Sequence, residues 1–160
     1  MNSFFRLIGN ILFWLAWPAL FIYLKNSKRC RVIISDGKNI LIVKNWLGPN
    51  KFTLPGGGLK KNENPKAGTA REIKEETGII VDSNNLSLIE PEKLVDEYGH
   101  SYESIGYLLK INQSPKIVRQ KFEIADIKWV DIQEALEKYS LTAAAKNLIT
   151  TWLDDNHLVD

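Results

Sequence analysis

The sequence predicts a layered α/β domain with a mixed β-sheet, preceded by a hydrophobic helix at the N-terminus. After the first 30 residues, segments typical of strands and of amphipathic helices follow in the order strands, helix, strands, helix, helix, which favours helices packed on a sheet. The length of 160 residues, with 44% hydrophobic and 25% charged residues, is typical of one globular domain with a core of its own.

The first strands are expected on either side of a tight turn. Residues 31–35 and 39–43 are rich in β-branched residues, and an Asp-Gly pair, a preferred two-residue hairpin turn, stands between them. A short strand over residues 52–54 and a glycine-rich bend at residues 55–58 would follow.

The next element is a helix with both ends marked. Asn64 is a candidate N-cap, Pro65 fits the first helical position, and Gly78 fits the C-terminal stop. An apolar side comes from three residues spaced three apart, namely Ala67, Ala70 and Ile73.

The second half of the chain predicts three more strands and two helices. The strands are expected at residues 86–96, 103–112 and 125–130. Asp131 could cap a helix from residue 132 to about residue 139, and a terminal helix is expected from residue 141 to about residue 153. Trp129 is expected to pack in the core.

The N-terminal segment is apolar over the length of a bilayer. Residues 7–24 contain 15 apolar residues out of 18 and no charged residue, and as a helix they would be about 27 Å long. The basic residues that follow, Lys25, Lys28, Arg29 and Arg31, favour a cytoplasmic location for the rest of the chain. Residues 1–28 are therefore interpreted as a membrane anchor with a basic flank, and residues 29–156 as a cytoplasmic domain.

Other interpretations of this segment stay open. Asn10 and Pro18 interrupt the apolar run, and Trp14 and Trp17 lie in its middle, away from the ends where such residues usually gather. A helix that docks on the domain or lies in the membrane interface is one alternative, in which case the protein could be soluble in the cytoplasm. A cleaved signal peptide fits less well, because no small-residue cleavage site follows.

Charge and cysteine content exclude some classes of protein. The net charge is +2, but residues 32–160 hold 16 basic and 19 acidic residues, which gives −3 and argues against a nucleic-acid-binding surface. Cys30 is the single cysteine, so an intramolecular disulfide is impossible. We interpret it as a structural or incidental thiol, in a basic stretch that could lower its pKa.

Three glutamates of the predicted helix are candidates for metal binding. Glu72, Glu75 and Glu76 are spaced i, i+3, i+4 and share one face of the helix. Arg71 can reach Glu75 at i+4, so two carboxylates lack a helical partner. A divalent cation would relieve their repulsion, and oxygen ligands suit Mg²⁺ or Mn²⁺. Without further residues, a solvated acidic face would be the better interpretation.

The residues that flank the three glutamates favour a metal site over a solvated acidic face. The string Gly57-x5-Glu63-x7-Arg71-Glu72-Ile73-x-Glu75-Glu76-x-Gly78-Ile79 matches every fixed position of the Nudix box, G-x5-E-x7-R-E-U-x-E-E-x-G-U with U apolar. The preceding Leu54-Pro55-Gly56 also resembles the usual lead-in to that box. Over roughly residues 29–155, the chain therefore resembles a Nudix hydrolase.

The resemblance implies a fold, an activity and roles for the box residues. It implies an α/β/α sandwich and Mg²⁺-dependent hydrolysis, with Mn²⁺ possible, of a nucleoside diphosphate linked to another moiety, X. The metal ligands would be Glu72, Glu75, Glu76 and the backbone carbonyl of Gly57. Arg71 would orient the glutamates, Glu63 would tie the loop to the helix, and Gly78 would be structural.

Hydrolysis also requires a group that accepts a proton from water. The resemblance implies either a box glutamate, here Glu76, or a glutamate on a later loop, for which Glu123 is the candidate and a solvated loop residue the alternative. Trp46 and Phe52 flank the loop before the box and are weaker candidates for the substrate pocket. The alternative function is a catalytically silent module that binds a nucleotide, and nothing in the loops identifies X.

Overall fold

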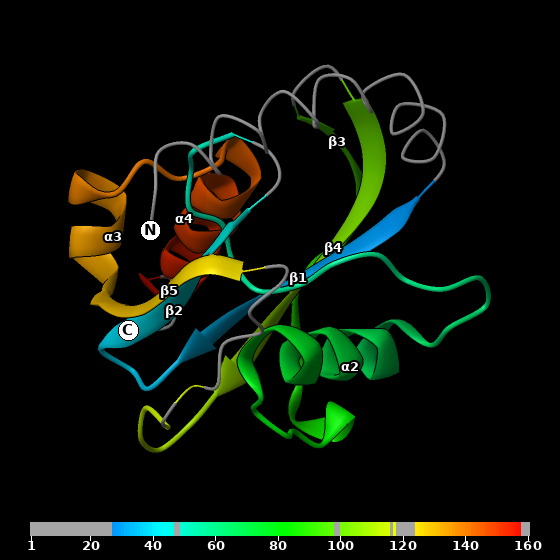
Figure 1. The fold of residues 1–160 in the computed structure, drawn as a ribbon, viewed down its shortest axis with the longest axis horizontal. Coiled ribbons are helices and arrows are strands. Elements are labelled where there is room, and N and C mark those ends of the chain that lie inside the picture. Colours follow the sequence, from blue (N-terminus) through cyan, green and yellow to red (C-terminus); the bar gives the residue numbers. More distant parts are fainter. Residues whose placement is uncertain (1–26, 47–48, 98–99, 116, 118–123, 158–160) are drawn as a thin grey trace.

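The predicted layered α/β fold is confirmed. The computed structural model describes residues 27–46, 49–97, 100–115, 117 and 124–157. They form a five-stranded mixed sheet in the order β3-β4-β1-β2-β5 with helices on both faces (Figure 1). The hydrophobic helix predicted over residues 7–24 lies outside these ranges. Within them, no helix is both long enough and apolar enough to cross a membrane.

The secondary structure follows the predicted order closely. The elements are β1 (Lys28–Ser35), β2 (Asn39–Asn45), α2 (Pro65–Thr77), the 3-10 turn η1 (Ser83–Asn85), β3 (Ser87–Glu97), β4 (His100–Lys110), β5 (Ile124–Asp131), α3 (Ile132–Lys138) and α4 (Ala143–His157). The terminal helix starts two residues later than predicted, because the Thr142 hydroxyl accepts the Ala145 N–H at 3.3 Å and so caps it. Residues 79–81, between α2 and η1, form no strand.

The predicted β1–β2 hairpin is present, but its strands separate soon after the turn. Ser35 and Ile40 are the only Cα partners in their register. On its other side β1 runs parallel to β4, and β2 is antiparallel to β5. The gap between β1 and β2 is filled by a segment from farther along the chain.

That segment is residues 52–59, which we call the inserted segment. Toward β1, the Val32 N–H donates to the Pro55 carbonyl and the Cys30 N–H to the Gly57 carbonyl, both at 2.9 Å. Toward β2, Val43 and Thr53 exchange backbone hydrogen bonds of 2.9 and 2.7 Å. The predicted short strand over residues 52–54 is therefore reduced to isolated bridges, and the glycine-rich stretch lies within the sheet.

Helix α2 begins and ends where the sequence predicts. The Asn64 side chain accepts the N–H groups of Lys66 and Ala67 at 3.0 and 3.2 Å, which caps the first turn. Gly78 has a φ of 74°, and its N–H donates to the Lys74 carbonyl at 2.9 Å. This left-handed conformation favours glycine and ends the helix.

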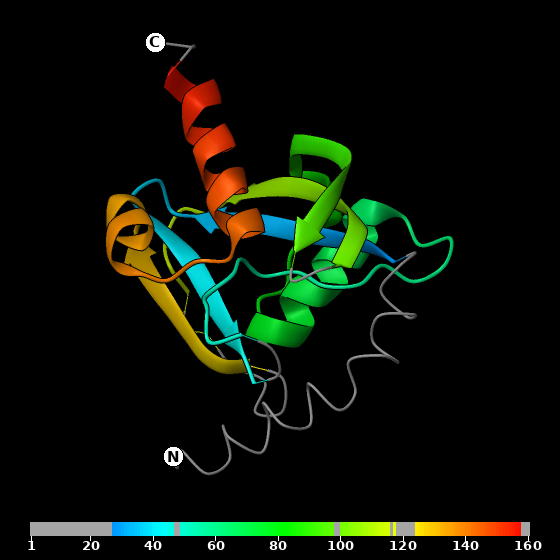
Figure 2. The same cartoon turned by 90° about the horizontal axis from the view of Figure 1, so that it is seen from above.

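The sheet has a separate core on each face, because alternate strand residues point to opposite sides. Val32 and Ile34 pack against α2 through Ile73, whereas Ile33 faces α3 and α4 together with Leu148. Figure 2 shows α2 and α4 on opposite sides of β1 and β2. The result is the expected α/β/α sandwich, with the three glutamates on the side of α2.

Candidate metal and pyrophosphate site

Helix α2 places the three predicted glutamates at different depths. Glu76 is buried, at 6% exposure, and the side chain of Glu72 is 13% exposed. The side chain of Glu75 is 46% exposed and faces solvent. The helix thus presents a row of carboxylates that runs from the inserted segment to the surface.

Arg71 joins this row to the loop that precedes the helix. Its Nε and Nη2 donate to the two carboxylate oxygens of Glu63, each at 2.9 Å, which is the bidentate geometry of a strong ion pair. Nη1 donates to Glu72 at 2.6 Å and to Glu75 at 3.3 Å, and Nη2 also donates to the Gly58 carbonyl at 3.0 Å. One guanidinium therefore fixes the loop and two of the glutamates.

Arg71 reaches Glu75 as expected, but the expectation that the other two carboxylates lack a helical partner is wrong for Glu72. Arg71 also binds Glu72, its neighbour in sequence, because the guanidinium folds back across the helix toward Glu63. Glu76 likewise has a partner, since its Oε2 accepts the Gly56 N–H at 2.9 Å. Sequence spacing along a helix could not reveal these bonds, because they depend on the position of the loop.

Glu63 is held as a charged group. It also accepts the Lys60 N–H at 2.8 Å. The hydrogen bonds from Arg71 and Lys60 lower the pKa of Glu63 to about 2. Gly68 leaves room for this carboxylate, because a methyl group on its α-carbon would lie 2.8 Å from Glu63 Oε2.

Two glycines of the inserted segment lie close to their neighbours. Gly56 has a φ of 136°, and a methyl group there would lie 2.2 Å from the Cys30 carbonyl oxygen. A methyl group on Gly57 would lie 2.4 Å from Glu72 Oε2. The backbone of residues 56–57 is therefore packed against both β1 and the carboxylates.

Cys30 lies directly beneath this backbone. Its side chain is 1% exposed, and its Sγ lies 3.7 Å from the Gly57 carbonyl oxygen, which also accepts the Cys30 N–H. The sequence left open whether the basic stretch lowers the pKa of this thiol, and burial instead raises that pKa. Cys30 is a structural thiol, as interpreted from the sequence.

The electrostatics of the row favour a cation. Burial raises the pKa of Glu72 and outweighs the opposing effect of Arg71, so the carboxylate is held where its charge is poorly solvated. In the ranges that the structure covers, no three acidic, histidine or cysteine side chains converge as a ready-made metal cage. Arg71 explains this, since it draws Glu72 and Glu75 toward itself. The oxygen donors nevertheless suit Mg²⁺ or Mn²⁺ in kind.

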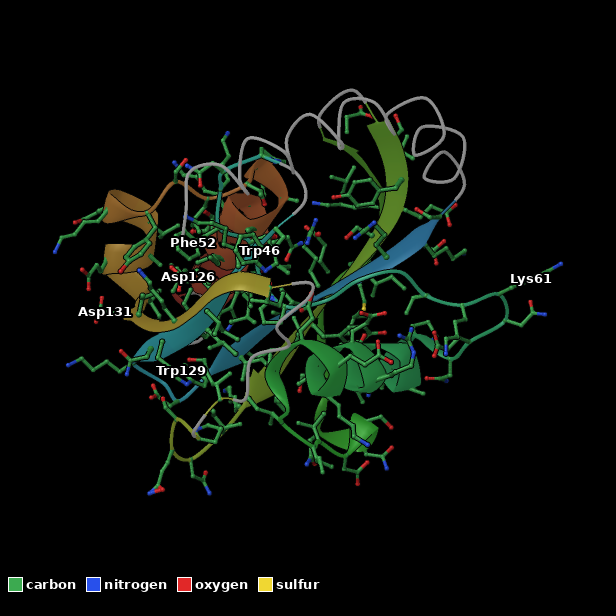
Figure 3. All side chains as sticks on the ribbon, in the orientation of Figure 1. Trp46, Phe52, Lys61, Asp126, Trp129 and Asp131 are labelled. Atoms are coloured by element: carbon green, nitrogen blue, oxygen red, sulfur yellow. The ribbon has the colours of Figure 1, made fainter. Side chains whose placement is uncertain are left out.

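Other candidate residues lie apart from the glutamates or outside the structure's described ranges. Glu123 lies outside the described ranges. Phe52 is buried, with 6% of its surface exposed, on the face of the sheet that α3 and α4 cover (Figure 3). Its ring packs edge-on against Tyr139, with the two ring centroids 5.3 Å apart. It is a core residue and does not line a pocket beside α2. Trp46 and Trp129 are both half-buried, and the Trp129 indole donates to the Pro115 carbonyl at 3.4 Å.

Apart from the Gly57 carbonyl, sequence reasoning did not name the backbone groups of the site. The Gly56 N–H binds Glu76, and the Gly58 carbonyl binds Arg71. Backbone groups carry no residue-type signal, so only the glycine-rich composition of the segment could have pointed to them.

Comparison with known proteins now identifies the family. The NUDIX domain profile matches residues 26–152. The chain belongs to the Nudix family. Among relatives of this Nudix protein, Nudix hydrolase 7 of Arabidopsis thaliana is 32% identical over 113 residues, which are 67% of this chain and 39% of that protein. The MutT-like protein of Streptomyces ambofaciens is 30% identical over 73% of this chain and 70% of its own length.

A third relative carries a more specific name. The ADP-ribose pyrophosphatase of Methanocaldococcus jannaschii is 34% identical over 92 residues, which are 56% of this Nudix chain and 54% of that protein. This chain therefore spans about half or less of two of its three relatives.

Solved structures share the Nudix fold. A MutT Nudix hydrolase from Burkholderia pseudomallei superposes with a TM-score of 0.68 at 21% identity, over 79% of this chain and 97% of that one. A bifunctional NMN adenylyltransferase/ADP ribose pyrophosphatase from Francisella tularensis gives a TM-score of 0.72 at 21% identity, over 94% of this chain and 48% of that one. At such identities the likeness shows the fold alone.

Proposed function

We propose that this protein is a Mg²⁺-dependent pyrophosphohydrolase that cleaves a nucleoside diphosphate linked to a moiety X, with Mn²⁺ as a possible substitute metal. One observation carries the proposal. Of the three glutamates of α2, Glu72 and Glu76 lie against the backbone of Gly57 and Gly56. Arg71 ties Glu72 and Glu75 to Glu63.

The glutamates are the proposed metal ligands. Glu72, Glu75 and Glu76 would hold the ion, and Arg71 would orient the first two through its hydrogen bonds. When bound, Mg²⁺ would neutralise phosphate oxygens and lower the pKa of a water molecule. The Gly57 carbonyl, which was expected to join the ligands, already accepts the Cys30 N–H. The Cys30 thiol also lies 3.7 Å from this oxygen.

Glu123 is the proposed proton acceptor. Hydrolysis joins water to one phosphorus and expels the other phosphate, so one proton of the water must go to a nearby base. Glu76 is the alternative, but it is buried, accepts the Gly56 N–H and is already proposed as a ligand. A glutamate outside the metal ligands is therefore the better candidate.

The names of relatives order the candidate substrates. One relative is named an ADP-ribose pyrophosphatase, as is one half of a solved structure with the same fold. ADP-ribose therefore comes first in a screen. NADH, nucleotide sugars, dinucleoside polyphosphates and nucleoside triphosphates follow, each tested with Mg²⁺ and with Mn²⁺.

The screen also tests the function, through a pair of variants. Glu75→Gln removes a proposed ligand charge from an exposed side chain, and Lys74→Gln changes an exposed neighbour on another side of α2. We expect turnover to fall by about 100-fold or more in the first variant and to persist in the second, with similar melting temperatures. Tight nucleotide binding without hydrolysis of any compound would instead show a silent binding module.

We also propose that residues 7–24 anchor the chain in a membrane with the Nudix domain on the cytoplasmic side. The support is the uncharged apolar run followed by a basic cluster. The alternative is a soluble cytoplasmic enzyme. Membrane fractionation tests the anchor, since a spanning segment should resist extraction by high salt and by alkaline carbonate. Release by salt alone would contradict it.

A further inference from the structure

A cavity of about 610 Å³ opens beside the loop that leads into α2. Ser27 and Lys28 line it from the start of β1, and Glu92 lines it from β3. Lys60, Lys61 and Asn62 line it from the loop. The cavity thus joins the point where the N-terminal segment enters the domain to a loop that carries two adjacent lysines.

The positive charge of this region comes from the loop. Lys28 is neutralised, since its Nζ pairs with Glu92 and lies 3.1 Å from Glu103. Lys60 and Lys61 form no ion pair with any residue that the structure describes. Both are exposed and line the cavity. Figure 3 shows Lys61 projecting from the tip of the loop, away from the body of the domain.

Acidic groups near the loop do not cancel this charge. Glu63 also lines the cavity, but both of its oxygens bind Arg71. Glu92 forms an ion pair with Lys28. Glu63 attracts Lys60 through space, but neither Lys60 nor Lys61 forms an ion pair with a described residue. We call the positive surface of these two lysines the lysine loop.

The lysine loop lies close to the end of the apolar run. Leu24 is the last residue of that run, and Lys25 follows it directly. Ser27 is the third residue after Leu24, and three residue steps span at most about 11 Å. Because Ser27 lines the same cavity as Lys60 and Lys61, the loop must stay near whatever surface holds the end of the run.

We infer that the lysine loop docks on an anionic phospholipid surface, beside the point where the apolar run meets the membrane. Lysines within a few ångströms of such a surface are attracted to its negative potential, and adjacent lysines add their effects. The docking holds the domain in one orientation on the membrane. It does not depend on the proposed hydrolysis.

The orientation has a consequence for the site. Glu63 lines the cavity, and the Arg71 guanidinium donates hydrogen bonds to both Glu63 and Glu72. Docking through the lysine loop therefore keeps the row of glutamates near the headgroup layer, in reach of pyrophosphates at the membrane surface.

Lysine acetylation of the full chain tests the inference, whether residues 7–24 span the bilayer or lie on it. The protein is mixed with vesicles of phosphatidylcholine alone or with about 30 mol % phosphatidylglycerol, and each lysine is quantified by mass spectrometry. We expect the anionic vesicles to slow acetylation of Lys60 and Lys61 by about fivefold or more. The exposed Lys110 and Lys146 serve as internal controls and should be unaffected. If anionic vesicles change the acetylation rates of all four lysines by the same factor, the inference is overturned.

A matched pair of variants distinguishes electrostatic docking from non-specific shielding of the lysines by the vesicles. In Lys60→Glu, the reversed charge should restore most of the acetylation of Lys61 on anionic vesicles, whereas Lys146→Glu should leave its protection intact. Protection that persists in Lys60→Glu, or that neutral vesicles give equally, would contradict electrostatic docking. Protection by inorganic phosphate without vesicles would also contradict it, because that outcome indicates a site for a small anion.

Discussion

The α-carbon of Gly57 faces the carboxylate of Glu72 so closely that a methyl group would lie 2.4 Å from Glu72 Oε2. The atom in the way is the end of a flexible side chain, so the fold could accommodate a methyl group by moving the carboxylate. Moving it would disturb its 2.6 Å bond to Arg71. Gly58, the next residue, has open space at the same position.

Comparing Gly57→Ala with Gly58→Ala therefore distinguishes an effect on the activity of the site from an effect on the stability of the fold. We expect Gly57→Ala to lower kcat/KM by about tenfold to 1000-fold, because the proposed ligand Glu72 is displaced. The midpoint of urea unfolding should change little. Gly58→Ala should keep both properties near the parent values. Equal activity in the two variants would contradict a role for Glu72 at its present position.

Gly56→Ala should act on stability instead. The methyl group would lie 2.2 Å from a carbonyl oxygen of β1, and a φ of 136° is strained for any residue with a side chain. We expect a loss of about 2–4 kcal/mol in the free energy of unfolding, measured by urea denaturation. An unchanged midpoint would mean that the inserted segment can leave β1 at little cost.

The ion pair of Glu63 and Arg71 should make stability depend on pH. The folded pKa of Glu63 is about 2, below the ordinary value of 4.5, so the pair stabilises the fold above pH 4.5 and loses its effect as the pH falls toward 2. We expect Glu63→Gln to cost about 1–2 kcal/mol at pH 7, since the pair is partly exposed, and much less near pH 2.

The measurement is the free energy of unfolding in urea at pH 7, 4 and 2.5, with the exposed Glu137→Gln as the control. The control should track the parent at each pH. A penalty for Glu63→Gln that stays constant with pH would show that the lost interaction is not that of a carboxylate with a depressed pKa.

Replacing the proposed base should change the pH dependence of turnover. In Glu123→Gln we expect kcat to fall by about 100-fold to 10,000-fold and the acidic limb of the pH profile to disappear, while the affinity for Mg²⁺ is retained. Glu76→Gln should instead weaken Mg²⁺ binding, because it removes a proposed ligand. If Glu123→Gln keeps the acidic limb, the base is one of the box glutamates.

Local signals were sufficient to predict α2, since Asn64, Pro65 and Gly78 act within a few residues of each helix end. The shared face of the three glutamates followed from helix geometry alone. Most strands were also predictable, because their β-branched residues and alternation are local. The order β3-β4-β1-β2-β5 was not predictable, since it depends on pairing between residues far apart in the chain.

The network around the glutamates was predicted only in part. Glu63 and Arg71 were expected to hold the loop and the glutamates, but the bond from Arg71 to Glu72 depends on where the loop lies. The place of Phe52, a weaker candidate for the pocket, was open for a related reason. Its neighbours in sequence do not reveal which face of the sheet it points to, and a shift of one residue reverses the face.

The inserted segment ties the glycine backbone of the site to the centre of the sheet. The N–H groups of Cys30 and Val32 donate to the Gly57 and Pro55 carbonyls, so these two amides are shielded only while the segment stays in place. Their hydrogen-exchange rates would therefore report how often the glycine backbone detaches. Because both lie in the middle of a buried strand, we expect such opening to be as rare as unfolding of the sheet itself. A substrate would then meet a backbone already ordered before it binds.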